Sequence, residues 1–226
     1  MNTQAILDFL SQLIVNNNRE WFNQHKQLYL NCKSDFESFV NQYIDKLSVA
    51  EPGLRGLTAQ ECEWRIYRDT RFSADKTPYK DHFGAFLAPH GGKKSPYGGY
   101  YLHLTPNGCM FAGGIWGPEK NLLQALRQSV LDNYDELEQI TQNTHFRKYF
   151  SGFDTYYQLS RTPLGFPRDF CHDDWLRLKA YTVTCPLTDE QVSDPQFLDL
   201  LMDISLATKP LNDFLNYTVD ELSGNL

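Results

Sequence analysis

The sequence predicts a single α+β domain over residues 1–226, in which a central antiparallel sheet of about five strands is covered by N-terminal and C-terminal helices. Helical periodicity is found at both ends of the 226-residue chain, and segments of alternating apolar and polar residues lie between them. Helices and strands that are segregated along a chain are typical of α+β proteins. No internal repeat or interdomain linker interrupts this order, and the length suffices for one large core.

The N-terminal part predicts two helices. Apolar residues recur at helical spacing from Ile6 to Ile14, behind Thr3 as the expected N-cap. A second helix is expected from about Arg19 to about Leu47, capped by Asn18. A seam with heptad spacing runs along it and consists of Phe22, His25, Tyr29, Cys32, Phe36, Phe39 and Tyr43. We expect the seam to pack inside the protein, because it lacks the Leu, Ile and Val pattern of a dimerising zipper.

Alternation and turns predict the strands. Four are expected in the middle of the chain, near residues 62–68, 83–89, 99–105 and 109–115, and a fifth at Tyr181–Leu187. Short connections such as Pro106-Asn107-Gly108 favour antiparallel pairing. In the first strand Trp64 alternates with polar residues, so its side chain is expected on the buried face.

Further helices are predicted after the central strands. Gly117-Pro118 is expected to start one, since proline is favoured at the first helical position. Asp173 or Asp174 should cap a short helical turn. Asp194-Pro195 should begin the last helix, which Pro210 is expected to break or kink.

Composition and charge exclude several function classes. The formal net charge of -7 and a pI near 5.3 argue against nucleic-acid binding, which usually requires a basic surface. No apolar segment is long enough to span a bilayer. Five widely spaced cysteines without a Cys-x-x-Cys pair predict free thiols and a reducing, cytoplasmic location. The histidines lack metal-ligand spacing and no glycine-rich phosphate motif occurs, so neither metal nor cofactor is expected.

Residues 64–80 carry the most distinctive chemistry. Two acids, Asp69 and Asp75, stand among five cations, Arg65, Arg68, Arg71, Lys76 and Lys80, which gives a local formal charge of +3. Guanidinium groups bind carboxylate and phosphate oxygens in pairs, and lysines add positive charge. The candidate ligands of an anionic small molecule are therefore Arg68, Arg71, Lys76 and Lys80. A second interpretation stays open, in which acids neutralise these cations and hold a structural loop.

Tyr101 and His103 share one face of a predicted strand, beside Gly113-Gly114 of the next strand. His103 is a candidate general acid or base, and together with Tyr101 and Trp116 it would line a wall of the anion site. The alternative is a half-exposed strand histidine with a β-bulge at the glycines. Paired glycines also allow a ligand or another backbone to approach closely. Whether the protein is an enzyme stays open.

The stretch 65–80 resembles the signature of the domain of unknown function 2461, an uncharacterised family of bacterial and fungal proteins. The pattern is Arg-x-x-Arg-Asp-x-Arg-Phe-Ser-x-Asp-Lys-x-Pro-Tyr-Lys. Further segments match in order at residues 17–22, 99–104, 113–118, 163–166 and 176–184. The resemblance spans nearly the whole chain. It implies an approximate fold, but no established activity and no catalytic residue.

Overall fold

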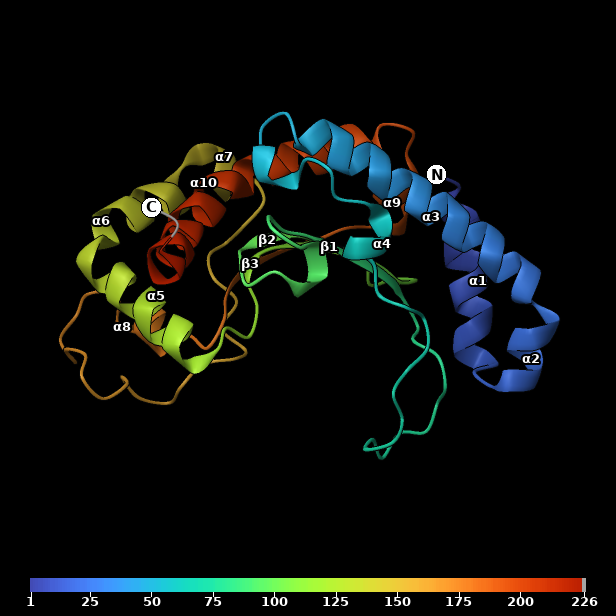
Figure 1. Cartoon of the computed structure of the whole chain (residues 1–226), viewed down its shortest axis with the longest axis horizontal. Coiled ribbons are helices and arrows are strands. Elements are labelled where there is room, and N and C mark those ends of the chain that lie inside the picture. Colours follow the sequence, from blue (N-terminus) through green and yellow to red (C-terminus); the bar gives the residue numbers. More distant parts are fainter. Residues whose placement is uncertain (225–226) are drawn as a thin grey trace. The chain divides into compact units, whose positions relative to one another are not determined.

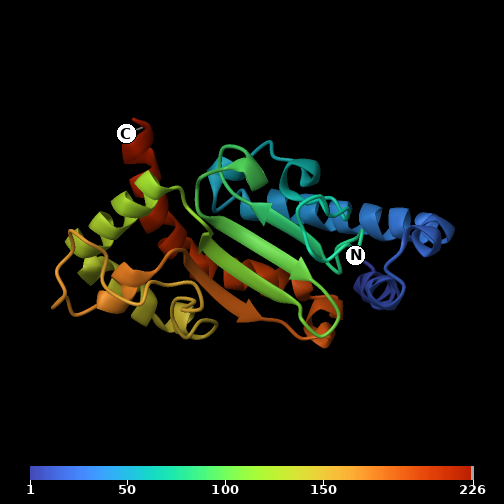
Figure 2. The ribbon, with the colours of Figure 1, turned by 90° about the horizontal axis from the view of Figure 1, so that it is seen from below.

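The computed structural model describes residues 1–224 and confirms the α+β fold class. The α-helices are α1 Thr3–Val15, α2 Arg19–Gln24, α3 Lys26–Leu47, α4 Ala59–Cys62, α5 Lys120–Asp132, α6 Tyr134–Gln142, α7 Thr144–Arg147, α8 Asp173–Arg177, α9 Asp189–Ser193 and α10 Phe197–Ser223, with 3-10 helices η1 Pro52–Leu54 and η2 Gly92–Lys94. Four strands form an antiparallel sheet in the order β1-β2-β3-β4 (Figure 2). They are β1 Phe83–Leu87, β2 Gly99–Leu104, β3 Met110–Ile115 and β4 Tyr181–Pro186.

The chain forms two compact units. The first contains residues 1–94, 101–111 and 186–202, and the second contains residues 95–100, 112–185 and those from 203 onward. Strands β2, β3 and β4 and helix α10 contribute residues to both units. The expected organisation as a single domain stays a prediction.

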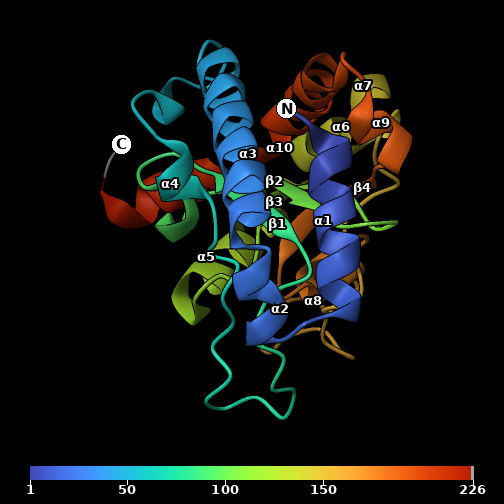
Figure 3. The ribbon, with the colours of Figure 1, turned by 90° about the vertical axis from the view of Figure 1, so that its right-hand side faces the viewer.

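In the first unit, helices α1 and α3 pack with β1 around the aromatic seam. Phe9 of α1 lies 6.4 Å from Phe22 and 6.0 Å from Tyr29, measured between ring centroids. Phe83 of β1 contacts Tyr29 and Phe36 from the other side. Helices α1 and α3 run side by side (Figures 1 and 3). The seam residues that carry these contacts are buried within the chain itself, which confirms the prediction of internal packing.

The second helix was expected to be continuous, but the structure divides it at His25. The backbone N–H of His25 is shared between the carbonyls of Trp21 and Phe22, and its Nδ1 lies 2.8 Å from the Trp21 oxygen. These contacts end α2, and α3 begins at the next residue. His25 is half-buried and stacks on Trp21, so it lies at the edge of the seam.

In the second unit, the glycine pair of β3 brings backbones close together. A Cβ atom on Gly113 would lie 2.2 Å from Thr208 of α10. Gly114 has a φ of +107°, and a Cβ there would lie 2.0 Å from the backbone oxygen of Tyr181 in β4. Close approach of neighbouring protein segments therefore explains why glycine occupies both positions.

The predicted strand at 62–68 is wrong, and the sheet has four strands instead of five. Cys62 ends α4, and the following residues form only isolated bridges, from Glu63 to Ala85 of β1 and from Tyr67 to Tyr79 of the segment before β1. Trp64 is 38% exposed, whereas Ile66 is 3% exposed. The backbone N–H of Trp64 pairs with the oxygen of Gly84. Glu63, which the alternation placed on the polar face, is only 8% exposed, so the alternation does not decide burial in this irregular segment and Trp64 is not buried as expected.

Several expected helix boundaries also differ from the structure. His172 rather than Asp173 or Asp174 caps α8, and the last helix begins at Phe197 instead of at Asp194-Pro195. Asn2 rather than Thr3 caps α1, and α5 begins at Lys120 with Glu119 as its N-cap. Helix α10 continues through Pro210 to Ser223. Proline removes the N–H that would bond the carbonyl of Leu206. Leu206 is 41% exposed, so this turn faces solvent, where water can bond the carbonyl.

Candidate functional site

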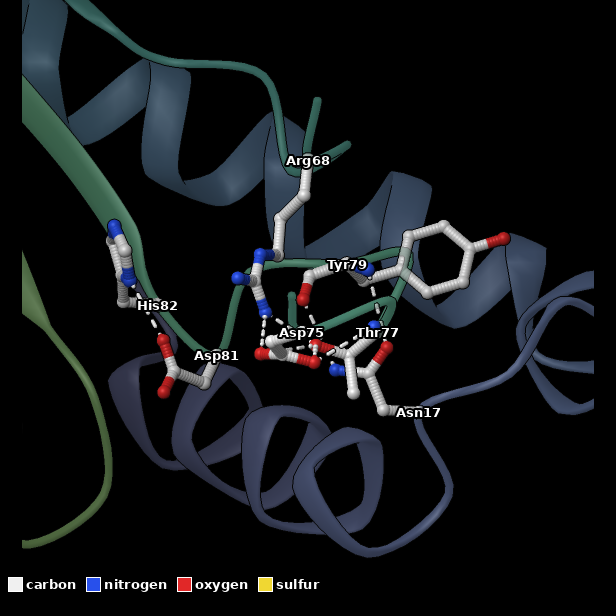
Figure 4. Close-up of polar contacts among 7 residues, drawn as sticks. All are labelled: Asn17, Arg68, Asp75, Thr77, Tyr79, Asp81 and His82. Atoms are coloured by element: carbon white, nitrogen blue, oxygen red, sulfur yellow. Dashed lines mark hydrogen bonds and ion pairs between the residues drawn. The ribbon is translucent and has the colours of Figure 1, made fainter. Parts of the chain in front are cut away.

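Residues 68–78 form the basic loop, which is fixed at its base by Asn17, between α1 and α2, and by Phe22 of α2. The side chain of Asn17 donates to the backbone oxygen of Tyr79 at 3.0 Å and accepts from the Tyr79 N–H at 3.1 Å (Figure 4). The Tyr79 ring stacks on Phe22, with centroids 3.9 Å apart. Two segments that resemble the family pattern therefore contact each other, and their contact is structural.

Arg68 braces the loop internally. Its Nη1 donates to the carboxylate of Asp75 and to the hydroxyl of Thr77 (Figure 4). Asp75 also accepts from the Thr77 backbone N–H at 2.9 Å. The hydrogen bond from the Thr77 N–H, and to a smaller extent the one from Arg68, lowers the pKa of Asp75 to about 2. These contacts are the ones expected if the cations hold a structural loop.

The other two predicted ligands in the loop have partners of their own. Arg71 binds the Asp69 carboxylate through two nitrogens, at 3.0 and 2.7 Å, and its side chain is 77% exposed. Lys76 donates to the backbone oxygen of Thr70 at 2.8 Å. The loop cations therefore contact separate acceptors, instead of converging on one point.

Lys80 differs from the loop cations. The residue is half-buried, and within residues 1–224 no carboxylate pairs with its amine. Burial lowers the pKa of Lys80, and the positive charges of Arg65 and Lys93 lower it further. A site where positive charges accumulate without an acid is stabilised by an anion. Of the four predicted cationic ligands, Lys80 is the one whose surroundings favour an anion most.

A histidine cluster follows Lys80 in the same compact unit and consists of Asp81, His82, Tyr101 and His103. The Tyr101 hydroxyl lies 2.8 Å from Nδ1 of His103. The His103 ring stacks on His82 with centroids 4.3 Å apart, and Nδ1 of His82 lies 2.9 Å from the Asp81 carboxylate (Figure 4). Tyr101 and His103 thus share a strand face, as predicted.

A bulge places Asp81 and His82 beside that strand. The bridges Tyr67–Tyr79 and Glu63–Ala85 are antiparallel. Glu63 and Tyr67 are four positions apart, whereas Tyr79 and Ala85 are six positions apart. The second segment therefore contains two extra residues, which form the bulge. Bulges of this kind re-aim side chains. The backbone oxygen of Asp81 is held in addition by the Thr105 hydroxyl at 2.8 Å.

The electrostatics of the cluster keep His103 neutral. Burial lowers the pKa of His103 from 6.5 to about 4, and the neighbouring His82 lowers it as well. Burial also raises the pKa of Tyr101 to about 12. No residue among 1–224 hydrogen-bonds to Nε2 of His103. A neutral imidazole with one nitrogen held by a tyrosine and the other without a hydrogen-bond partner in the described chain is able to exchange a proton with a ligand that reaches it.

Neighbouring residues make room for Tyr101. A Cβ atom on Gly84 would lie 2.9 Å from the Tyr101 hydroxyl, so glycine leaves the space that the hydroxyl requires. The Trp64 ring meets the Tyr101 ring edge-on at 5.6 Å.

Sequence reasoning missed His82 as a partner of His103, because only the bulge brings it there. The sequence signal that could have pointed to His82 is the adjacent pair Asp81-His82.

Trp116 belongs to the second compact unit. Its ring is 60% exposed and contacts the rings of Tyr156 and Tyr157, at 5.9 and 5.6 Å between centroids. The structure therefore gives this predicted wall residue partners other than Tyr101 and His103.

Three further features of the described chain concern metal ligands, membrane helices and thiols. Residues 1–224 contain no group of three or more His, Cys, Asp or Glu side chains arranged to hold a metal ion. No helix in this range is long and apolar enough to cross a membrane. All five cysteines are free, and only Cys171 is exposed.

Comparison with known proteins identifies one family. The family model described as a conserved hypothetical protein (DUF2461) matches residues 5–214, nearly the whole chain. The match confirms the resemblance seen in residues 65–80. No curated protein and no solved structure shows significant similarity to the chain.

Proposed function

We propose that this chain, which belongs to the DUF2461 family, binds a small carboxylate- or phosphate-bearing molecule beside the histidine cluster and exchanges a proton with it through His103. Lys80 supplies positive charge to the bound group. Tyr101 fixes the ring of His103, and His82 with Asp81 supports it from the other side.

The contact between Tyr101 and His103 is the observation that carries this proposal. The hydroxyl occupies Nδ1 of His103, so Nε2 is the nitrogen that meets the ligand. A side chain held in this way is preorganised, which reduces the entropy lost on binding. An anion near Nε2 favours the protonated ring. Binding of the ligand would therefore raise the pKa of His103 toward neutrality, where proton exchange is efficient.

The loop cations have auxiliary roles in this proposal. Arg71 forms an exposed pair with Asp69, and exposed pairs of this kind are weak. An incoming anion can therefore replace Asp69 as the partner of Arg71. Arg68 and Lys76 hold the loop in shape.

The experiment compares melting temperatures in sodium phosphate, sodium sulfate and sodium succinate with those in sodium chloride of equal ionic strength. At least one polyvalent anion should stabilise the wild-type protein, and Lys80→Met should abolish that stabilisation. Lys94→Met removes an exposed lysine and should change nothing. Titration of the histidine ring protons by NMR should show a higher His103 pKa with the anion present. An anion effect that survives in Lys80→Met contradicts the proposal.

A structural module is the second candidate, because the Arg68 brace and the Asn17–Tyr79 contact hold the loop without any ligand. In that case no anion stabilises the wild-type protein, and Arg68→Ala lowers its melting temperature in plain buffer. If anion stabilisation persists in Arg68→Ala, the brace and the binding site are separate features.

We also infer a cytoplasmic location. Five free thiols, four of them buried, suit a reducing compartment. Fractionation of cells that express the untagged protein tests this inference, and recovery of the protein in an oxidising compartment would overturn it.

A further inference from the structure

An exposed group of aromatic rings lies in the second compact unit. We call Trp116, Tyr156 and Tyr157 the aromatic platform. Their exposed fractions are 60%, 72% and 44%. The Trp116 ring makes angles of 29° with Tyr156 and 32° with Tyr157. Large apolar side chains exposed together, rather than singly, mark binding surfaces.

Backbone hydrogen bonds fix the segment that carries the two tyrosines. The N–H of Asp154 donates to the oxygen of Thr182 at 2.8 Å. Further along, the N–H of Lys179 donates to the oxygen of Tyr157 at 3.0 Å, and Gln158 pairs with Leu178 in an antiparallel bridge. Exposed rings on a fixed backbone lose little entropy when a ligand binds.

Polar groups lie over one ring of the platform and next to another. The amine of Lys179 lies 4.9 Å from the centre of the Tyr157 ring. Oδ2 of Asp154 accepts hydrogen bonds from the hydroxyls of Thr182 and Thr184, at 2.8 and 2.9 Å. Its other oxygen has no hydrogen-bond partner among residues 1–224. Lys179 therefore offers a hydrogen-bond donor near the rings, and Asp154 offers an acceptor.

We propose that the aromatic platform binds a neutral carbohydrate, whose ring faces lie on Trp116 and Tyr156 while its hydroxyls contact Asp154 and Lys179. A pyranose has an apolar C–H face and hydroxyls at its edge, which match apolar rings with a polar margin. This inference uses no residue of the histidine cluster and stands or falls independently of the proposed function.

Size and charge argue against other occupants. The rings expose roughly 350 Å² if each aromatic side chain offers about 200 Å². A stable protein interface needs about 800 Å² from each partner, so a second protein or a second copy is disfavoured. The net charge of -7 disfavours a nucleic acid.

The experiment follows tryptophan fluorescence and saturation-transfer NMR during titration with maltotriose, cellotriose and chitotriose. At least one trisaccharide should bind saturably. Trp116→Ala should weaken that binding by about tenfold or more, and Trp116→Phe should restore part of it. Tyr217→Ala removes an equally exposed tyrosine of α10 (54%) and should leave binding unchanged. Melting curves show whether each variant is folded.

Several outcomes would overturn this proposal. They are failure of all three sugars to bind, equal binding by folded Trp116→Ala, and tighter binding of adenosine than of any sugar. Dimerisation of the wild-type protein that Trp116→Ala abolishes, measured by sedimentation, would show that the platform is an interface between copies of the chain.

Discussion

The carboxamide of Asn17 pairs with both backbone groups of Tyr79, in the way that a neighbouring strand would. Sixty-two positions separate the two residues along the chain. One side chain thus satisfies a buried residue's donor and acceptor at the point where the basic loop leaves the core.

Removal of this carboxamide should destabilise the protein. Asn17→Ala leaves the N–H and the carbonyl of buried Tyr79 without partners, which should cost about 1–3 kcal/mol of unfolding free energy. Asn23 is exposed in α2, and Asn23→Ala should change that free energy by less than about 0.5 kcal/mol. Urea unfolding measures both variants. Equal values would mean that water replaces the Asn17 contact at no cost.

The corrected assignment of Trp64 gives a second prediction. Ile66 is 3% exposed, so Ile66→Ala should cost about 2–5 kcal/mol. Trp64 is 38% exposed, so Trp64→Ala should cost less, below about 2 kcal/mol. Chemical denaturation of both variants checks the order. A larger loss of unfolding free energy in Trp64→Ala than in Ile66→Ala would mean that Trp64 is buried, as the sequence predicted.

The glycine pair of β3 gives a third prediction with a matched control. Gly114 and Gly117 both have positive φ, but a Cβ atom would collide with the Tyr181 backbone only at Gly114. Gly117→Ala should cost about 1–2 kcal/mol from backbone strain. Gly114→Ala should cost more than about 3 kcal/mol, because the collision adds to the strain. Similar melting temperatures for the two variants would argue against the close packing of β3 on β4.

The lowered pKa of His103 predicts a pH-dependent stability. The unfolded side chain titrates near 6.5 and the folded one near 4, so below pH 6.5 the unfolded state binds a proton that the folded state does not. The stability associated with His103 is complete above pH 6.5 and is lost as the pH falls toward 4. The loss should reach about 2 kcal/mol after allowance for solvent screening at this half-buried site.

His103→Asn isolates this contribution from that of the carboxylates. The difference in unfolding free energy between wild type and His103→Asn should fall between pH 6.5 and pH 4 and stay constant above pH 7. A difference that does not vary with pH would mean that the imidazole is better solvated than the structure indicates.

The cysteines predict two classes of thiol. Burial raises the pKa of Cys32, Cys62, Cys109 and Cys185, and these residues are shielded from reagents. Cys171 is exposed and should react first. Titration with a thiol reagent should find one fast thiol in the native protein and five after unfolding without reductant. A total below five would reveal a disulfide.

The sequence predicted the parts of the fold that depend on local pattern. Alternation located β2, β3 and β4, and the spacing of Phe22, Tyr29 and Phe36 identified a seam that is buried in the structure. The break at His25 and the passage of α10 through Pro210 were missed, because each depends on a local balance of hydrogen bonds that has no residue signature. Trp64 was misplaced because alternation indicates burial only within a regular strand, and the residues after Cys62 form isolated bridges instead.

For the candidate site, sequence pattern placed Tyr101 and His103 on one strand face, and the structure adds their hydrogen bond. The pattern could not show that His82 stacks on His103, because a two-residue bulge sets that position. Counting charges identified the basic loop, but it could not separate Arg68, which has Asp75, from Lys80, which has no acid. That difference depends on distances across the fold.

The division into two compact units constrains how this chain can be cut or inherited. The chain passes between the units five times, after residues 94, 100, 111, 185 and 202. No single cleavage point therefore yields a fragment that contains all of one unit and nothing of the other. Fission of the gene anywhere between the codons for residues 95 and 202 would divide both units at once. A protein with this threading is expected to be inherited whole, which is consistent with a family match over nearly the entire chain.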